Sequence, residues 1–273
     1  MNHVAELGPW ALVTGASAGI GAEFCRQLAD RGYSLVLVAR RQDRLEELAD
    51  ALARQHAIGS LVLPLDLAQA GAARTIESAL AEASIEVDFL VNNAGYGVPG
   101  TLTEPAWQVH ADSLAVMLNS VVELTWRLLP GMQRRRQGFV VNVASLAGLL
   151  PGSARHTLYG PTKAFLVKFS ESLAMENLST GVAVSALCPG FTYSEFHDVL
   201  NVRDLVSQMP SWMWMEASDV VRYGIESVTR NPPRIIAVPG RVNRSIALLF
   251  RILPQKLTQV IVQRESRRWR KQD

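Results

Sequence analysis

The sequence predicts an α/β fold, a doubly wound parallel β-sheet with helices on both faces. Three observations support this. Short apolar runs alternate with helical patterns along the chain. The apolar runs are continuous rather than alternating, which is typical of strands buried on both faces. Helical segments separate consecutive runs, as the crossovers of a parallel sheet require. A three-layer α/β/α architecture follows.

The individual elements can be placed along the sequence. The expected strands are the apolar runs 10–13, 34–39, 61–65, 88–92, 139–143, 182–188 and 234–238. The expected helices cover 20–31, 72–83, 103–129, 159–178 and 217–229, and one further helix is indicated by Leu45, Leu48, Ala49 and Leu52, which recur at i, i+3, i+4 and i+7. The dipeptide Pro130-Gly131 is expected to end the long fourth helix. Residues 1–240 therefore read as one domain, and 241–273 as a separate tail.

Length and composition narrow the class of protein. The 273 residues, 48% of them hydrophobic, suit one domain with a sizeable core. The two cysteines are far apart in the sequence, which argues against a disulfide framework and a thiolate zinc site. The five histidines show no metal-ligand spacing, so no catalytic metal is expected. No signal peptide and no long apolar stretch is evident, so a cytoplasmic protein is the default expectation.

A glycine-rich turn follows the first strand. The segment 14–21, Thr-Gly-Ala-Ser-Ala-Gly-Ile-Gly, joins that strand to the first helix. Gly15, Gly19 and Gly21 allow a tight turn and a close approach of the backbone to a pyrophosphate, which the N-terminus of the helix would then face with its free N–H groups. The strand–loop–helix context that such a motif requires is present.

A phenol and an ammonium group stand four residues apart. Tyr159 and Lys163 share one face of the predicted helix 159–178. Free tyrosine titrates near about 10, and a nearby cation favours the phenolate and lowers that pKa. Tyr159 could then act as a general acid or base. Ser145, just past the fifth strand, could hydrogen-bond a substrate oxygen.

Taken together, these motifs resemble the short-chain dehydrogenase/reductase family. The resemblance rests on T-G-x-x-x-G-x-G, on 92–95 (Asn-Asn-Ala-Gly) after the fourth strand and on Y-x-x-x-K, and it extends from the first strand to about Val238. It implies a Rossmann-type fold and a catalytic set in which Tyr159 is the acid/base, Lys163 tunes it and holds the nicotinamide ribose, Ser145 orients the carbonyl and Asn119 supports a proton relay. The implied cofactor contacts are Gly15, Ser17, Gly19, Ile20, Gly21, Arg40, Arg41, Asp66, Asn92, Ala94, Gly95, Tyr159, Lys163, Pro189, Gly190 and Thr192.

The end of the second strand indicates the type of cofactor. An acidic residue there would bind a ribose 2′-hydroxyl and repel a phosphate. This chain has Arg40 and Arg41 instead, and guanidinium groups bind phosphate well. NADP(H) is therefore favoured over NAD(H). The alternative is that these arginines are merely solvated at the start of a helix.

Two loops are expected to shape the substrate pocket. Fourteen positions separate Ser145 from Tyr159, one more than is common in the family, so Ser153 competes with Ser145 and His156 could touch substrate. The segment 193–215 reads as a lid rich in Met, Trp and Leu. An apolar lid suggests a lipophilic substrate, although such residues can equally pack on the core or on a neighbouring subunit.

The last 33 residues are strongly basic. From 241 to 273 there are nine Lys or Arg and two acidic residues, a charge of +7, whereas the rest of the chain carries −5. Ile246, Leu249, Phe250 and Leu253 recur at helical spacing, with Arg244 and Arg251 roughly opposite. Such a segment can pack on its own domain or a partner subunit, or it can lie on an anionic membrane surface. Contact with nucleic acid is not expected, because no recognition motif accompanies the charge.

The sequence thus predicts an oxidoreductase that moves a hydride between NADP(H) and a hydrophobic ketone, aldehyde or secondary alcohol. The resemblance also implies a homodimer or homotetramer built through the two long helices. Two alternatives stay open. One is an epimerase or dehydratase that uses the same Tyr-x-x-x-Lys pair. The other is a non-catalytic NADPH-binding sensor or a membrane-associated scaffold.

Overall fold

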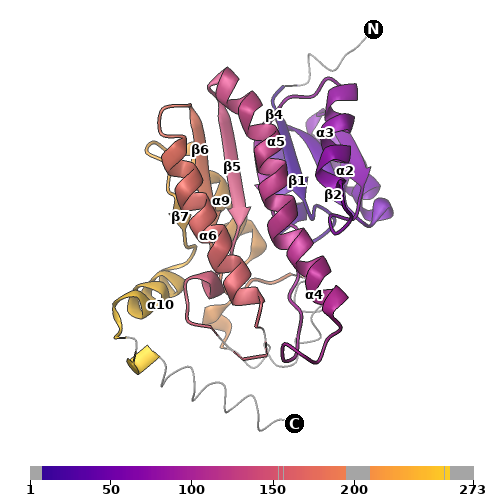
Figure 1. Ribbon diagram of the computed structural model, residues 1–273. Helices are drawn as coiled ribbons and strands as arrows, with labels where there is room; N and C mark the ends of the chain where they lie inside the picture. Colours follow the sequence, from indigo (N-terminus) through magenta and orange to yellow (C-terminus); the bar gives the residue numbers. More distant parts are fainter. Residues whose placement is uncertain (1–7, 153, 156, 195–209, 255, 259–273) are drawn as a thin grey trace.

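A computed structural model describes residues 8–152, 154–155, 157–194, 210–254 and 256–258. Within them, a seven-stranded, all-parallel sheet has the order β3-β2-β1-β4-β5-β6-β7, and helices cover both of its faces (Figure 1). The strands are β1 (Trp10–Thr14), β2 (Ser34–Ala39), β3 (Ser60–Pro64), β4 (Val87–Asn92), β5 (Gly138–Val143), β6 (Val182–Leu187) and β7 (Ile236–Ala237). The predicted fold class is confirmed.

The helices follow the predicted order. They are α1 (Gly19–Ala29), α2 (Gln42–His56), α3 (Ala72–Glu82), α4 (Trp107–Leu114), α5 (Ser120–Arg135), α6 (Tyr159–Glu176), α9 (Ala217–Thr229) and α10 (Arg241–Ile252). Three short segments join them: the π-helical turn η2 (Ala115–Asn119) and the 3₁₀ turns η3 (Leu146–Gly148) and η4 (Ser211–Met213). No helix within these residues is long and apolar enough to cross a membrane.

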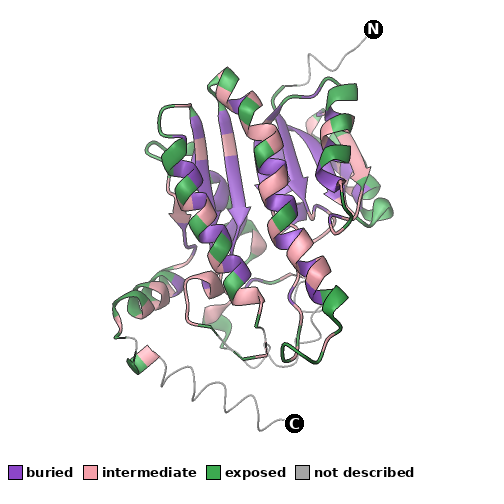
Figure 2. Cartoon of the chain, in the orientation of Figure 1, coloured by how far each residue is buried: buried purple, intermediate pink, exposed green. Residues whose placement is uncertain are grey.

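Two apolar cores lie on opposite faces of the sheet. One is built from α1, α2 and α9, and the other from α3, α5 and the C-terminal part of α6. A third cluster joins α6 to the ends of β5 and β6 and to α10. The strands β1, β2, β4, β5 and β6 are buried almost throughout (Figure 2), as their continuous apolar runs predict, whereas the edge strand β3 is only half-buried or exposed.

The long fourth helix differs from its prediction at both ends. It begins at Trp107 rather than at 103, and it continues past Pro130 to Arg135. A proline inside a helix loses one hydrogen bond. Here the following turn is held by tertiary packing, because Met132 is fully buried against Gly138. Burial therefore outweighs the local signal of Pro130-Gly131.

The order of the strands locates the functional edge. β1 lies between β2 and β4, so the connections leaving β1 and β4 diverge to opposite sides of the sheet. In open parallel sheets, ligands bind beyond the carboxyl ends of the strands at such a switch point. The loops after β1, β4, β5 and β6 carry most of the predicted site residues to this edge.

Candidate active site

The glycine loop between β1 and α1 has the backbone geometry that its sequence predicts. Gly15 and Gly19 have positive φ angles, +67° and +52°. A Cβ on Gly21 would lie 2.1 Å from the Gly15 carbonyl oxygen, so only glycine allows α1 to begin this close to the loop. Ala18, the N-cap, offers no side-chain acceptor to the first N–H groups of α1. These groups fit a pyrophosphate.

Asn93 ties the end of β4 to this loop. Its Nδ2 donates to the Thr14 carbonyl at 2.9 Å, and the Thr14 hydroxyl accepts the N–H groups of Asn93 at 2.9 Å and of Ala94 at 3.0 Å. Asn93 and Thr14 were not assigned roles from the sequence, although both lie inside the quoted motifs. They fix Ala94 and Gly95 beside the glycine loop.

The side chain of Asn92 does not line the cleft, which corrects one prediction. Asn92 is only 2% exposed. Its Nδ2 donates to Asn142 Oδ1 at 2.8 Å and to Thr125 Oγ1 at 3.2 Å, and Asn142 Nδ2 donates onward to Ser170 Oγ at 2.9 Å. As the last residue of β4, Asn92 points into the space under α5 and α6. Its side chain joins β4 and β5 to these two helices.

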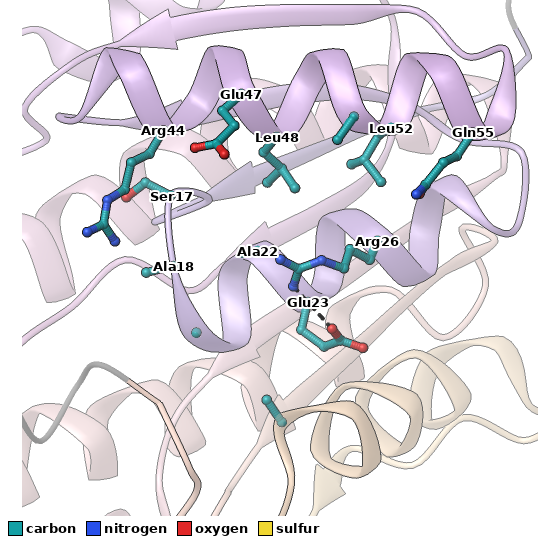
Figure 3. A pocket seen from close by; sticks show the side chains of 13 residues that line it. Ser17, Ala18, Ala22, Glu23, Arg26, Arg44, Glu47, Leu48, Leu52 and Gln55 are labelled. Atoms are coloured by element: carbon teal, nitrogen blue, oxygen red, sulfur yellow. Dashed lines mark hydrogen bonds and ion pairs between the residues drawn. The ribbon is translucent and has the colours of Figure 1, made fainter.

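Basic side chains gather beside the glycine loop. Arg41 reaches Ser17 Oγ through Nη2 at 3.1 Å and Nε at 3.3 Å, so these two predicted contacts lie together. A cavity of about 560 Å³ between α1 and α2 opens next to them, with Ser17 and Arg44 at one end (Figure 3). Arg44 was not named from the sequence, although it lies in the first turn of α2, just after Arg40 and Arg41. This corner offers several donors to an anion.

Two further predicted contacts, Arg40 and Asp66, act on Tyr96 through their charges. Burial raises the pKa of Tyr96, and the charges of Asp112 and Asp66 raise it further while Arg40 lowers it. Arg40 is exposed, and Asp66 is half-buried with its carboxylate accepting the N–H of Ala68 at 3.0 Å. Arg40 and Asp66, which follow β2 and β3, are thus both within electrostatic range of Tyr96, which follows β4. Tyr96 is a site residue that the sequence analysis missed.

Ser145, Tyr159 and Lys163 are brought together at the carboxyl end of β5. Ser145 caps η3, where its Oγ accepts the N–H of Ala147 at 3.1 Å. The side chains of Tyr159 and Ser145 are hydrogen-bonded. Lys163 is buried, with its Nζ donating to the Val143 carbonyl at 2.7 Å and lying 5.8 Å from the centre of the Tyr159 ring.

The titration behaviour of this group differs from the expectation. Burial raises the pKa of Tyr159, and the hydrogen bond with Ser145 only partly opposes this. Burial also lowers the pKa of Lys163 to about 8. The expected lowering of the Tyr159 pKa by the lysine charge is thus not found: burial raises this pKa, and the opposing effect comes from Ser145. In this state Tyr159 is a protonated phenol at neutral pH, the form that a general acid needs.

Asn119 is not part of this group, which corrects a second prediction. It is exposed at the end of η2 and lies with Trp126 and Phe165 on the outer surface of α5 and α6. The η2 side chain nearest to the site is instead Met117. A Cβ on Gly95 would meet Met117 Sδ at 3.2 Å and Lys163 Nζ at 3.7 Å. Two residues that are two positions apart on a helix point to opposite faces. The prediction chose Asn119, whereas the helix turns Met117 toward the site.

The loop between Ser145 and Tyr159 is packed tightly onto α6. A Cβ on Gly148 would lie 2.6 Å from the carbonyl carbon of Lys163, so this glycine is needed for the close approach. Leu149 and Leu150 pack against the third core cluster. Ser153 and His156, the other candidates of this loop, lie outside the described residues.

The loop after β6 completes the site edge. The Pro189 carbonyl accepts the N–H of Leu146, which links this loop to the Ser145 segment at 2.7 Å. Thr192 is buried, and its hydroxyl donates to the Gly190 carbonyl at 3.1 Å. Within the described residues, no group of three or more His, Cys, Asp or Glu side chains could hold a metal ion.

Both ends of the predicted lid are joined at its base. Thr192 and Met215 form a parallel bridge, and Trp214 stacks on Tyr193 at 4.8 Å and contacts Phe191 at 5.5 Å between ring centres. Residues 195–209, which hold most of the predicted apolar lid, lie outside the described residues. The described base of the segment is thus aromatic and next to the site.

Comparison with known proteins agrees with this geometry. The family model described as short chain dehydrogenase matches residues 9–203. Very-long-chain 3-oxoacyl-CoA reductase-A from Danio rerio is 32% identical to this chain, and the match covers 68% of this chain and 59% of that protein. The very-long-chain 3-oxoacyl-CoA reductase from Rattus norvegicus is 30% identical, and the match covers 87% of this chain and 75% of that protein. The chain thus spans less than two thirds of the length of the first of these relatives.

A solved structure is similar over nearly the whole chain. The short-chain dehydrogenase from Sphingobium yanoikuyae in complex with NADPH has a TM-score of 0.78 and 27% identity, and the match covers 91% of this chain and 97% of that one. The fold of this chain therefore agrees with the family that the sequence comparison indicates. This chain belongs to the short-chain dehydrogenase family of oxidoreductases.

Proposed function

We propose that this protein is an NADPH-dependent reductase that transfers a hydride to the carbonyl carbon of a hydrophobic substrate. The observation that carries the proposal is the meeting of Ser145, Tyr159 and Lys163 at the sheet edge that also bears the glycine loop. One geometry thus provides a cofactor cradle, a carbonyl-binding hydroxyl and a proton donor.

Each side chain has a distinct role in the proposed reaction. Bound NADPH supplies the hydride. The Ser145 hydroxyl donates a hydrogen bond to the substrate carbonyl oxygen and polarises it. The Tyr159 phenol gives its proton to that oxygen, since its raised pKa keeps it protonated at neutral pH. The Lys163 ammonium, held by the Val143 carbonyl, stabilises the phenolate that remains. The same steps in the opposite direction oxidise an alcohol, and Tyr159 then acts as the base.

The basic corner supports NADPH as the preferred cofactor. Arg41 already lies against Ser17, and Arg44 is at the end of the adjoining cavity, so the ribose 2′-phosphate would meet two guanidinium groups and a hydroxyl. No acidic residue stands at the end of β2, where one would repel that phosphate. The likeness to a structure solved with NADPH supports the same choice.

The substrate class is proposed from two observations. The base of the segment over the site is formed by Phe191, Tyr193 and Trp214, which favours an apolar group on the substrate. Two similar proteins are named very-long-chain 3-oxoacyl-CoA reductases. A ketone on a long acyl chain would match both observations. We therefore propose a 3-oxoacyl thioester as the first substrate to test.

We also propose that the protein forms a homodimer through α5 and α6. Trp126 and Phe165 are exposed on these helices and share a shallow groove with Leu118 and Val122. Exposed aromatic side chains gathered on one face are typical of an interface. Size-exclusion chromatography with light scattering would test this, with Trp126→Arg predicted to yield monomers.

Steady-state NADPH and NADH oxidation on 3-oxoacyl thioesters of increasing chain length tests the function. The proposal expects higher kcat/KM with NADPH and with longer chains. Arg41→Ala should raise the KM for NADPH by about tenfold, the effect of losing one charged hydrogen bond, without changing the KM for NADH. Arg54→Ala, an exposed change elsewhere on α2, is the matched control. Tight NADPH binding with no turnover on any carbonyl would contradict the reductase and favour a cofactor-binding sensor.

A further inference from the structure

The helix α10 is fixed to the active-site end of the domain through its inner face. Asn243 is buried, and its Nδ2 donates to the Pro239 carbonyl at 3.0 Å and to Met215 Sδ at 3.4 Å. A Cβ on Gly190 would lie 2.5 Å from Asn243 Oδ1, so the helix rests directly on the loop after β6. The position of α10 is therefore set by residues next to the cofactor cleft.

The inner face also touches the loop that carries Ser145. Ile246 and Ala247 pack against the third core cluster, to which Leu149 and Leu150 also belong. Figure 1 shows α10 beside the end of the sheet toward which the β5 arrow points, where the site loops lie. The helix thus borders the same edge of the molecule as the catalytic group.

The outer face of α10 combines apolar and cationic side chains. Leu248 and Ile252 are 59% and 69% exposed, and Leu249 is also exposed. Figure 2 shows α10 drawn mostly in the colours of exposed and intermediate residues. Arg244 and Arg251 are exposed and stand three or four positions from Leu248, which places them beside it on the helix surface. No acidic residue occurs between 241 and 264.

We propose that this face docks on an anionic lipid surface. A helix with exposed leucine and isoleucine flanked by arginines can lie in the plane of a bilayer, its apolar side chains at the acyl boundary and its guanidinium groups among the phosphates. The negative charge of acidic lipids would attract the arginine side chains of α10. Just after α10, Lys256 and Leu257 are also exposed, so a cationic and an apolar side chain again lie next to each other.

Charge argues against a second copy of the chain as the occupant. A twofold contact is self-complementary, so each residue meets residues of the same patch. The arginines of α10 would then face arginines, with no acidic partner between 241 and 264 to neutralise them. Like charges brought together at an interface oppose association. An anionic bilayer removes this repulsion, whereas a homodimer through this face creates it.

Docking has a consequence for substrate entry. Since α10 lies on the loops around Ser145 and Gly190, the lipid surface would lie close to the mouth of the site. A lipophilic substrate could then pass from the bilayer into the cleft. This consequence rests on the proposed reductase function, but the docking itself does not.

Vesicle flotation of the full-length chain, without substrate, tests the proposal. The vesicles are of phosphatidylcholine alone or of phosphatidylcholine with phosphatidylglycerol. Binding should require the anionic lipid and weaken as salt is raised. The double variant Leu248→Ser/Ile252→Ser should bind at least about tenfold more weakly. Each of Arg244→Gln and Arg251→Gln should weaken binding about fivefold, the contribution of one charge near such a surface.

Matched controls separate docking from general surface effects. Leu178→Ser changes a leucine that is 77% exposed just after α6, and Arg54→Gln removes an exposed charge on α2. Both should bind as wild type does. Equal binding to neutral and anionic vesicles, or full binding by the double variant, would overturn the proposal. The proposal would also be overturned if wild type did not bind vesicles and the double variant formed a smaller oligomer than wild type. NADPH oxidation with a soluble short-chain substrate, measured separately, would reveal failure of the reductase function.

Discussion

Met117 and Lys163 approach the same side of Gly95: a Cβ on that glycine would lie 3.2 Å from the Met117 sulfur and 3.7 Å from the Lys163 ammonium nitrogen. The wall of the site that η2 contributes is therefore apolar at this point. Lys163 relies on the Val143 carbonyl for its hydrogen bond. The asparagine expected to serve a proton relay, Asn119, faces outward.

The first prediction follows from this arrangement. Asn119→Ala should leave kcat within about twofold of wild type, because this side chain lies on the outer surface of α5 and α6 and not beside Tyr159 and Lys163. Ser145→Ala, measured in parallel, should lower kcat strongly because it removes the proposed hydrogen bond to the carbonyl. Steady-state NADPH oxidation provides both values. A large loss of kcat in Asn119→Ala, with an unchanged fold by circular dichroism, would return Asn119 to the catalytic group.

The second prediction concerns pH and stability. The pKa of Lys163 is lowered to about 8 in the folded protein, so between about pH 8 and its ordinary pKa the unfolded chain binds more protons than the folded one. The contribution of Lys163 to the free energy of unfolding must then rise with pH in this window.

Urea denaturation of wild type and Lys163→Met at pH 7 and pH 9 measures this effect. Wild type should gain stability relative to the variant between the two pH values, by an amount on the order of 1 kcal/mol for one pKa unit. Burial raises the thiol pKa values of Cys25 and Cys188 to about 12, so ionisation of these thiols in the unfolded chain lowers stability in the same window, but both proteins carry them and the comparison with the variant removes this effect. A difference that is constant with pH would mean that Lys163 titrates normally.

The third prediction tests the close approach of η3 to α6. Gly148→Ala would place a methyl group 2.6 Å from the Lys163 backbone, so the loop must shift and carry Ser145 away from Tyr159. We expect at least about a tenfold loss of kcat, since small displacements of catalytic groups cost rate steeply. Gly152→Ala, in the same loop but with no atom within 4 Å of the added Cβ, should behave like wild type. Equal activity of both variants would show that Ser145 need not be held in this position.

The fourth prediction concerns the buried polar group between the sheet and its helices. Asn142→Ala removes the acceptor of Asn92 and the donor to Ser170. Leaving a buried donor unpaired should lower the free energy of unfolding by about 1–3 kcal/mol. Chemical denaturation would show this, and Gln55→Ala, which changes an exposed amide on α2, should change the free energy of unfolding little. An unchanged midpoint for Asn142→Ala would mean that this network contributes nothing to stability.

Much of the fold could be predicted because its signals are local and strong. The continuous apolar runs predict the ends of the seven strands to within two residues. Gly15 and Gly21 occupy the tight turn that their spacing predicts. The end of α5 could not be predicted, because burial of Met132 overrides Pro130. Such packing depends on a residue from another element, which a local pattern does not contain.

The site was predictable where spacing alone determines geometry. Tyr159 and Lys163, one turn apart, necessarily share a face of α6. The errors arose where the direction of a side chain decides its role. Asn92 and Asn93 are adjacent yet point to opposite sides of β4, and Asn119 lies two residues from Met117 on η2. The titration of Tyr159 was also misjudged, because burial of both groups cannot be read from their spacing.

The most direct test of the central claim compares wild type with Tyr159→Phe, which keeps the aromatic ring and removes the proton donor. NADPH binding is followed by nicotinamide fluorescence and turnover by absorbance with a 3-oxoacyl thioester. We expect wild type to oxidise NADPH, and Tyr159→Phe to bind NADPH within about twofold of wild type while its kcat falls by at least about 100-fold. Turnover by Tyr159→Phe at the rate of wild type would contradict Tyr159 as the acid and with it the mechanism proposed for this site.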